Sequence, residues 1–245
     1  MWLRTTCAAV LLISAAACSG GGIGRQYEYE EEVYLDTDGS ATVVVNSSLP
    51  ALATLHGLDV PLDAGARVDR GRIRSLYESA VTDVLRVSRP WRKKGRRFIQ
   101  VRVEVSDIRR LGEAAPFAWS KYGFDREQGL AVFRQSVGTP AERRVSFDGW
   151  DGSELVAFRL HVPSRIVYHN APSKRVERGN ILEWQQPLRE RLGGAPVSIE
   201  VRMTPVSILY RTLLLFGATL TAALALLAGI VWWVWRKGRA AMPPG

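Results

Sequence analysis

A strict two-residue alternation marks the start of the central part of the chain. Residues 27–35 (YEYEEEVYL) alternate two Tyr, a Glu, a Val and a Leu with positions that are mostly acidic. A β-branched run follows at 40–49, after the turn-forming residues DTDG at 36–39. When a pattern repeats every two residues, every second side chain lies on the same face of a strand. The pattern predicts a β-hairpin that turns at 36–39.

The remaining pattern alternates between strand and helix signals. Val68, Ile73, Leu76 and Tyr77 recur at helical spacing, which predicts an amphipathic helix over 66–79. We expect a second, short helix at 107–114. Strands are predicted at 81–89 and 96–105, in a hairpin over 117–137 that turns at 125–129, and within 154–163, 164–170, 180–188 and 197–203. This order favours an α+β fold with an antiparallel sheet covered by helices, and the alternative is a small β-barrel or sandwich.

The N-terminal 17 residues have the pattern of an export signal. An uncharged stretch over 5–17 follows Arg4, and it is too short for a membrane span of about 20 residues. Three Ala residues then precede Cys18, an arrangement that resembles the lipobox of bacterial lipoproteins, although Ala15 stands where Leu is usual. We therefore expect a signal over 1–17, lipidation of Cys18 and a flexible tether over 18–26. The alternative is an ordinary signal cleaved nearby.

A second apolar run closes the chain. Residues 212–235 contain no charge, which predicts a transmembrane helix. Three Trp residues end this run, and Arg236, Lys237 and Arg239 follow it at once. By the positive-inside rule we expect a cytoplasmic tail at 236–245 and an extracytoplasmic domain at 27–205. The expected location is a bacterial cell membrane, with the domain tethered at both ends.

Charge adds little to this description. Arg outnumbers Lys 28 to 5, a bias that we attribute to GC-rich codons. The net charge of +9 falls to +4 within 19–205, where 28 cations face 24 carboxylates. An extracytoplasmic domain with this small excess is not expected to bind nucleic acid.

One basic segment is the main candidate for a contact site. Residues 89–97 (RPWRKKGRR) hold six cations and a Trp at a predicted hairpin tip. Near an anionic surface each cation contributes about 1 kcal/mol, and Trp favours the membrane interface. The alternative is a solvated turn. We predict contact with the membrane or with an acidic partner through Arg89, Trp91, Arg92, Lys93, Lys94, Arg96 and Arg97.

Other candidates for chemistry are weak. The segment DTDGS at 36–40 starts like a calcium loop but lacks the Gly and Glu that such a loop needs, so a hairpin turn is the better interpretation. A second acidic group, Asp148, Asp151 and Glu154, fits an exposed turn equally well. The three histidines, His56, His161 and His169, show no metal-binding spacing. We expect no catalytic residue, cofactor or metal, and no enzyme activity.

The segment 158–188, together with 197–203, resembles the closing part of the LppM-like domain of bacterial lipoproteins. The residues that carry the resemblance are Pro163, Asn170, Gly179, Asn180 and Trp184, although Ser164 stands where the family tends to have Gly. The resemblance implies an α+β envelope domain, an apolar ligand cavity and no catalytic residues. We therefore expect a non-enzymatic domain that binds a lipid, a glycan or an envelope protein. The alternatives are an interaction module of a membrane complex and an envelope hydrolase.

Overall fold

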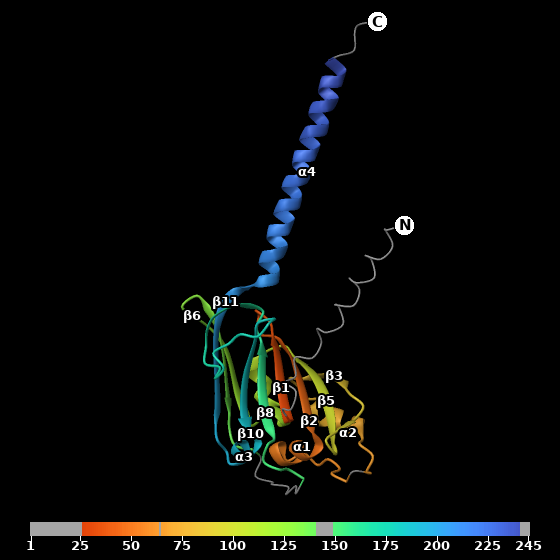
Figure 1. Cartoon of the computed structure of the whole chain (residues 1–245), viewed down its shortest axis with the longest axis vertical. Helices are drawn as coiled ribbons and strands as arrows, with labels where there is room; N and C mark the ends of the chain where they lie inside the picture. Colours follow the sequence, from red (N-terminus) through yellow and green to blue (C-terminus); the bar gives the residue numbers. More distant parts are fainter. Residues whose placement is uncertain (1–25, 64, 141–148, 241–245) are drawn as a thin grey trace, which may run out of the picture.

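The computed structural model describes residues 26–63, 65–140 and 149–240. The expected signal over 1–17 and the expected lipidation site Cys18 lie outside these residues. The chain forms two sheets and one long helix that projects from them (Figure 1).

The first sheet has seven strands, in the order β10-β8-β1-β2-β5-β3 with β4 beside β5. Their bounds are β1 (Tyr27–Leu35), β2 (Ala41–Ser48), β3 (Asp83–Val87), β4 (Trp91–Lys93), β5 (Arg96–Val105), β8 (Leu155–His161) and β10 (Ile181–Pro187). β1 pairs with β8 in parallel, and the other pairs of this sheet are antiparallel. The predicted hairpin is present as β1 and β2.

The second sheet is antiparallel, in the order β6-β7-β11-β9. Its strands are β6 (Ser120–Glu127), β7 (Leu130–Val137), β9 (Ser164–His169) and β11 (Val197–Ser207). Buried residues of the two sheets form one core, and Tyr29, Phe133 and Phe158 are each at most 2% exposed. The α+β class is confirmed, but the first sheet is covered by a second sheet as well as by helices.

Short helices cover parts of the sheets. They are α1 (Leu49–His56), α2 (Arg70–Tyr77), α3 (Leu188–Leu192) and the 3₁₀ helices η1 (Ile108–Glu113) and η2 (Ala115–Phe117). The helix expected over 66–79 begins at Arg70, because the Asp69 side chain accepts hydrogen bonds from the backbone amides of Gly71 and Arg72. Sequence patterning did not predict α1 or α3.

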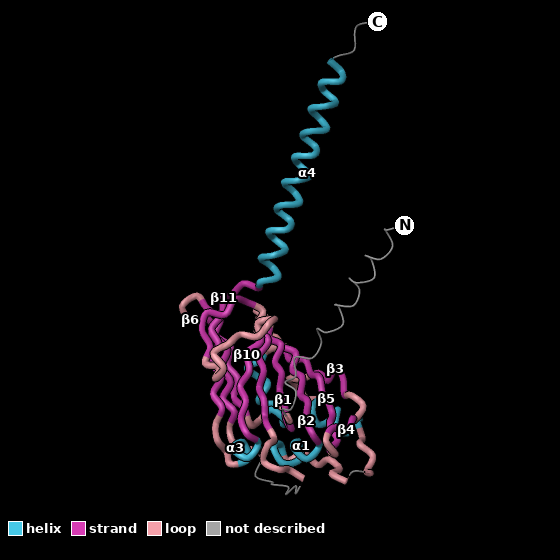
Figure 2. Tube along the Cα trace, viewed as in Figure 1, coloured by secondary structure: helices cyan, strands magenta, loops and turns pink. Residues whose placement is uncertain are grey.

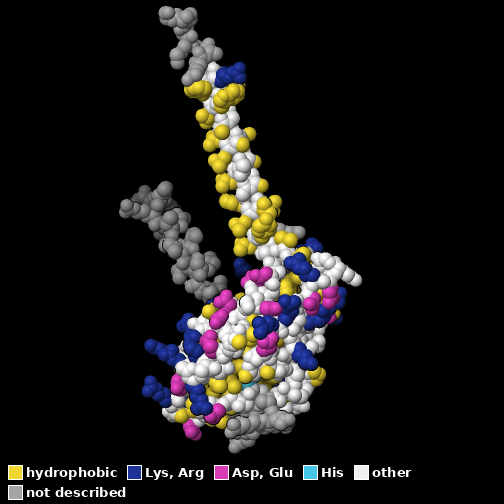
Figure 3. Space-filling model, turned by 180° about the vertical axis from the view of Figure 1, so that it is seen from behind, with side chains coloured by type: hydrophobic (Ala, Val, Ile, Leu, Met, Phe, Trp, Pro, Cys, Tyr) yellow, Lys and Arg dark blue, Asp and Glu magenta, His cyan; other side chains and the backbone are white. Residues whose placement is uncertain are grey.

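The last helix, α4 (Ile208–Ala240), follows β11 without an intervening loop. Residues Ile208–Lys237 are long and apolar enough to cross a membrane, and they include the predicted span at 212–235. Figure 3 shows α4 as an apolar column that ends in Lys and Arg side chains, whereas the surface of the sheets is mixed in charge.

The domain has two distinct ends, which position every candidate site. We call the end where β11 meets α4 the α4 end; there, the Ile208 amide donates a hydrogen bond to the Pro163 carbonyl oxygen, 3.1 Å away. α1 and α3 lie at the opposite end, which we call the distal end (Figures 1 and 2). The start of β5 belongs to the distal end, because Phe98 pairs with Ser48 immediately before α1. The β4–β5 hairpin therefore lies far from α4.

Candidate functional site

The basic segment 89–97 forms a tight hairpin at the distal end. Trp91 pairs with Phe98, and the pairing continues to Lys93 and Arg96. Lys94 and Gly95 make the turn with φ values of +48° and +76°. Positive φ at both turn positions suits the twist of a two-residue hairpin, and Gly adopts this conformation without strain. The predicted hairpin tip is confirmed.

The residues of this hairpin divide into an exposed set and an inward-facing set. Arg89, Trp91, Arg92, Lys93 and Lys94 are exposed. The Trp91 ring is 38% exposed and stacks on Phe98 with ring centroids 5.9 Å apart. This stacking gives the Trp a structural role in addition to any contact with a partner.

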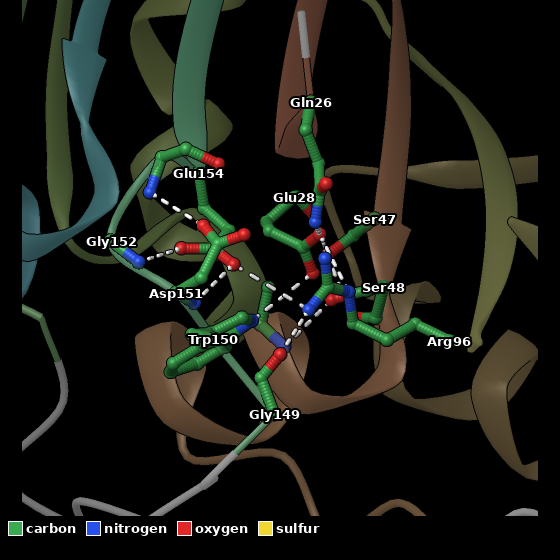
Figure 4. A network of polar contacts seen from close by, with 12 residues as sticks. Gln26, Glu28, Ser47, Ser48, Arg96, Gly149, Trp150, Asp151, Gly152 and Glu154 are labelled. Carbon is green, nitrogen blue, oxygen red and sulfur yellow. Dashed lines mark hydrogen bonds and ion pairs between the residues drawn. The ribbon is translucent and has the colours of Figure 1, made fainter. Parts of the chain in front are cut away.

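Arg96 does not belong to the exposed set, contrary to the sequence-based expectation. Its side chain is 9% exposed and lies between two carboxylates at the distal end (Figure 4). The guanidinium Nε lies 3.0 Å from Glu28 Oε1, and Nη1 lies 3.5 Å from Glu154 Oε1. Buried carboxylates require a cation or hydrogen-bond donors, and Arg96 provides the cation. It therefore stabilises the base of the hairpin and is not available to a partner.

The two carboxylates extend this network to the segment before β8. Glu154 accepts hydrogen bonds from the backbone amides of Asp151 and Gly152 at 2.9 and 2.8 Å. The Trp150 indole donates to Glu28 at 3.3 Å. Burial raises the pKa of Glu28, and the Arg96 charge and the hydrogen bonds offset part of this increase. Glu154, from the acidic group predicted at 148–154, is thus held inside the fold by an ion pair and two hydrogen bonds. Asp148 lies outside the described residues.

Arg97 also faces the protein. Its guanidinium donates hydrogen bonds to the carbonyl oxygens of Pro61, Asp63 and Ala66, three residues of the loop that precedes α2. The loop is thereby fixed beside the hairpin. Sequence reasoning missed this connection, because the six cations of the segment look equivalent until strand register assigns them to different faces.

The fixed loop brings further cations to the distal end. Arg67 follows Ala66, and Arg70 begins α2; both side chains are exposed. Within the described parts of the chain, no carboxylate lies within 4 Å of a cationic group of Arg67, Arg70, Arg89, Lys93 or Lys94. We define the hairpin surface as the exposed residues Arg67, Arg70, Arg89, Trp91, Arg92, Lys93 and Lys94.

The three histidines lie apart from this surface. His56 packs between Tyr29 and Trp119, with ring centroids 5.0 and 4.5 Å away. Burial lowers the pKa of His56 to about 3. His161 stacks on Tyr34, and His169 ends β9. Among the described residues, no group of three His, Cys, Asp or Glu side chains could hold a metal ion.

The segment 36–40 forms the hairpin turn that the sequence predicted. The Asp36 amide donates to the Ser40 carbonyl oxygen at 2.8 Å, and Asp38 Oδ1 accepts from the Ser40 amide and hydroxyl at 2.9 and 2.7 Å. These contacts within the turn explain the acidic residues without a bound cation.

The core contains a carboxylate whose environment the sequence did not reveal. Glu31 is 1% exposed and accepts hydrogen bonds from the hydroxyls of Tyr29 and Tyr122 and from the Gln135 amide, all at 2.8–2.9 Å. Tyr122 and Gln135 belong to the second sheet, so this carboxylate joins the two sheets. Burial raises its pKa, and the three donors offset part of the increase. The contacts fit a structural role.

Comparisons with known proteins give one structural likeness. No protein-family model and no curated protein matches the chain. The structure is similar to the NMR structure of the folded domain of Mycobacterium tuberculosis LppM, with 11% sequence identity and a TM-score of 0.37. The match covers 74% of this chain and 91% of that chain. That protein is named for the same family that the segment 158–188 resembles in sequence.

Proposed function

We propose that this chain is a non-enzymatic, membrane-tethered domain that binds a polyanionic component of the cell envelope through the hairpin surface. The observation that carries the proposal is the position of the exposed cations. The cations of the hairpin surface lie at the end of the domain opposite α4, on a hairpin and a neighbouring loop that Arg96 and Arg97 hold in place (Figure 2). A surface of this kind suits an acidic partner that lies beyond the domain.

The length of the domain favours such a partner over the bilayer that holds α4. β11 has 11 residues and runs from the distal end to the α4 end. At about 3.3 Å per residue it spans roughly 35 Å, which is several Debye lengths at physiological salt. The sequence predicted contact with a membrane or an acidic partner, and the acidic partner is the version that we propose.

The interior supports a surface function better than a ligand cavity between the sheets. Tyr29, Phe133 and Phe158 are buried in this region, and Glu31 accepts hydrogen bonds from three donors. Glu28 and Glu154 are likewise held by Arg96 and by neighbouring hydrogen-bond donors. These contacts favour structural roles for the buried carboxylates over the hydrolase alternative.

The cellular arrangement is part of the same proposal. The export signal and the cations after residue 235 favour an extracytoplasmic domain, a cytoplasmic C-terminus and a lipid on Cys18. Alkaline phosphatase fused after residue 245 should be inactive, whereas a fusion after residue 202 should be active. The opposite pattern would contradict the topology.

Lipidation of Cys18 has a separate test. Palmitate labelling that is equal for the wild type and Cys18→Ser would contradict lipidation.

Binding by the hairpin surface can be tested with the full chain in nanodiscs of neutral phosphatidylcholine. The probe is polygalacturonate, an acidic polysaccharide, and dextran of equal length is the neutral control. We expect polygalacturonate to bind at low salt and dextran not to bind. A triple variant, Arg89→Ser with Lys93→Ser and Lys94→Ser, should weaken binding about tenfold or more, because exposed charge contacts contribute up to about 1 kcal/mol each.

A second triple variant provides the matched control. Arg165→Ser with Arg175→Ser and Arg178→Ser removes the same charge from the α4 end. It should bind polygalacturonate nearly as tightly as the wild type. Equal weakening by the two variants would show that general charge and not the hairpin surface is responsible. Equal binding of dextran would show that the polysaccharide is not bound through its charge.

A further inference from the structure

A second basic surface lies at the α4 end of the domain. It consists of the exposed side chains of β9 and of the loop over 170–180 that leads to β10, and we call it the β9–β10 surface. β9 begins at Ser164, which pairs with Ser207, the residue before α4. The Asn180 side chain donates a hydrogen bond to the Ser164 carbonyl oxygen at 3.1 Å. Both ends of this surface are therefore tied to the point where α4 begins (Figure 1).

The cations of this surface have no ion-pair partner among the residues that the structure describes. Arg165, Lys174, Arg175 and Arg178 are exposed, and in the described portion of the chain no carboxylate lies within 4 Å of their charged groups. Other arginines on the second sheet differ in this respect. Arg134 and Arg202 pair with Glu127 and Glu200 at 2.6 and 2.7 Å. The unpaired charges are available to anions outside the protein.

Exposed apolar side chains accompany these cations. Val167 is 52% exposed, Tyr168 48% and Val176 44%. Single exposed apolar residues are common, but here three of them lie in two neighbouring segments beside four cations. Tyr in particular favours the headgroup level of a bilayer, where its ring and hydroxyl meet different environments. The combination of apolar and cationic side chains matches a lipid interface better than a purely aqueous surface.

The surface also contains a recess. A hollow of about 620 Å³ lies between the loop and β10. Arg175 and Arg178 line it together with Ser173, and so do Glu177 and Glu183. Glu183 is paired with Arg159 at 2.6 Å. Guanidinium groups bind phosphate oxygens with two parallel hydrogen bonds, so Arg175 and Arg178 are the side chains of this recess that suit the phosphate of a lipid headgroup.

We propose that the β9–β10 surface rests on the anionic headgroups of the bilayer that α4 spans. The proposal concerns the opposite end of the domain from the hairpin surface and does not depend on what that surface binds. An anionic leaflet attracts cations that lie within about a Debye length of it, and this surface carries four. Because α4 already holds the domain at the bilayer, this attraction fixes the orientation of the domain.

Lysine reactivity in the full chain tests the proposal without a mutation. The chain is placed in nanodiscs of phosphatidylcholine alone or with 30% phosphatidylglycerol, and the acylation rate of each lysine is measured by mass spectrometry. We expect Lys174 to react several-fold more slowly in the anionic discs, with the difference lost at high salt. Lys93 and Lys94, at the distal end, serve as internal controls and should react equally in both discs.

A variant identifies the surface responsible. In the triple variant Arg165→Ser with Arg175→Ser and Arg178→Ser, Lys174 should react at the same rate in both kinds of disc. A wild-type Lys174 rate that is equal in the two discs would overturn the proposal. Slowing of Lys93 and Lys94 to the same extent as Lys174 would also overturn it, because the domain would then not be oriented by its α4 end.

Discussion

The indole Nε1 of Trp184 donates a hydrogen bond to Oδ1 of Asn170, 3.1 Å away. Asn170 Oδ1 also accepts from the Glu200 amide at 2.9 Å, and its Nδ2 donates to the Ser198 carbonyl oxygen at 2.9 Å. Asn170 thus joins β10 of the first sheet to β11 of the second. Two residues on which the sequence resemblance rests have a structural function here.

Replacing Asn170 with Ala should therefore destabilise the domain more than replacing it with Asp. Asn170→Ala removes three hydrogen bonds and leaves the buried indole unpaired, at a cost of about 1–3 kcal/mol. Asn170→Asp keeps the acceptor oxygen and should cost less. Urea denaturation of the full chain in detergent gives the free energies of unfolding. An alanine variant as stable as the aspartate variant would contradict the role of the acceptor.

Arg96 should be essential for stability, unlike its neighbours in the hairpin. Arg96→Met leaves Glu28 and Glu154 buried without their cation, which we expect to cost about 3–5 kcal/mol. Lys93→Met, at the paired position of the same hairpin, should change the free energy of unfolding by less than about 0.5 kcal/mol. Adding Glu28→Gln to Arg96→Met should restore part of the loss. Equal effects of the two Met variants in thermal denaturation would contradict burial of Arg96.

His56 should make the domain sensitive to acid. Its pKa is about 3 in the folded state and about 6.5 in the unfolded state, so the unfolded state binds a proton first as pH falls. The His56 contribution to stability is therefore present above pH 6.5 and declines between pH 6.5 and 3. We expect a loss of about 2 kcal/mol by pH 5. In His56→Leu this part of the loss should vanish, whereas the variant His161→Gln, at a partly exposed position of β8, should retain it.

Glu31 should have the opposite dependence on pH. Burial raises its folded-state pKa, so the folded state favours the neutral acid. Its contribution is greatest below the unfolded pKa near 4.5 and declines as pH rises through the folded pKa. Glu31→Gln does not titrate and can still bond the two Tyr hydroxyls, so it should gain stability relative to the wild type as pH rises above about 4.5. A stability difference that is constant with pH would contradict this assignment.

Local sequence patterns predicted much of the fold but not its long-range pairing. The β1–β2 and β6–β7 hairpins follow from alternation and turn residues. The parallel pairing of β1 with β8 joins segments more than 100 residues apart, and no local signal encodes it. α1 was missed because LPALATLH has no polar face, and seven of its eight residues are buried. The Ser48 cap, Pro50 and Gly57 were the available signals.

The candidate site was located correctly as a hairpin but not in its details. Charge density identified 89–97, yet only strand register separates Arg96 and Arg97 from the exposed cations. Glu28 gave no sign of this, because the alternation over 27–35 places it among the acidic positions, whereas the structure buries it. Arg67 and Arg70 could not be assigned to the same surface from sequence, because the Arg97 hydrogen bonds that fix their loop cross more than 30 residues.

The direct passage from Ser207 of β11 to Ile208 of α4 has a mechanical consequence. β11 lies inside the second sheet, between β7 and β9, so a rotation of the helix acts on a strand that is held on both sides. A helix tilts when its apolar length exceeds the local bilayer thickness. In the proposed arrangement, in which α4 crosses a bilayer, the thickness of that bilayer would therefore change the angle between the whole domain and the membrane surface.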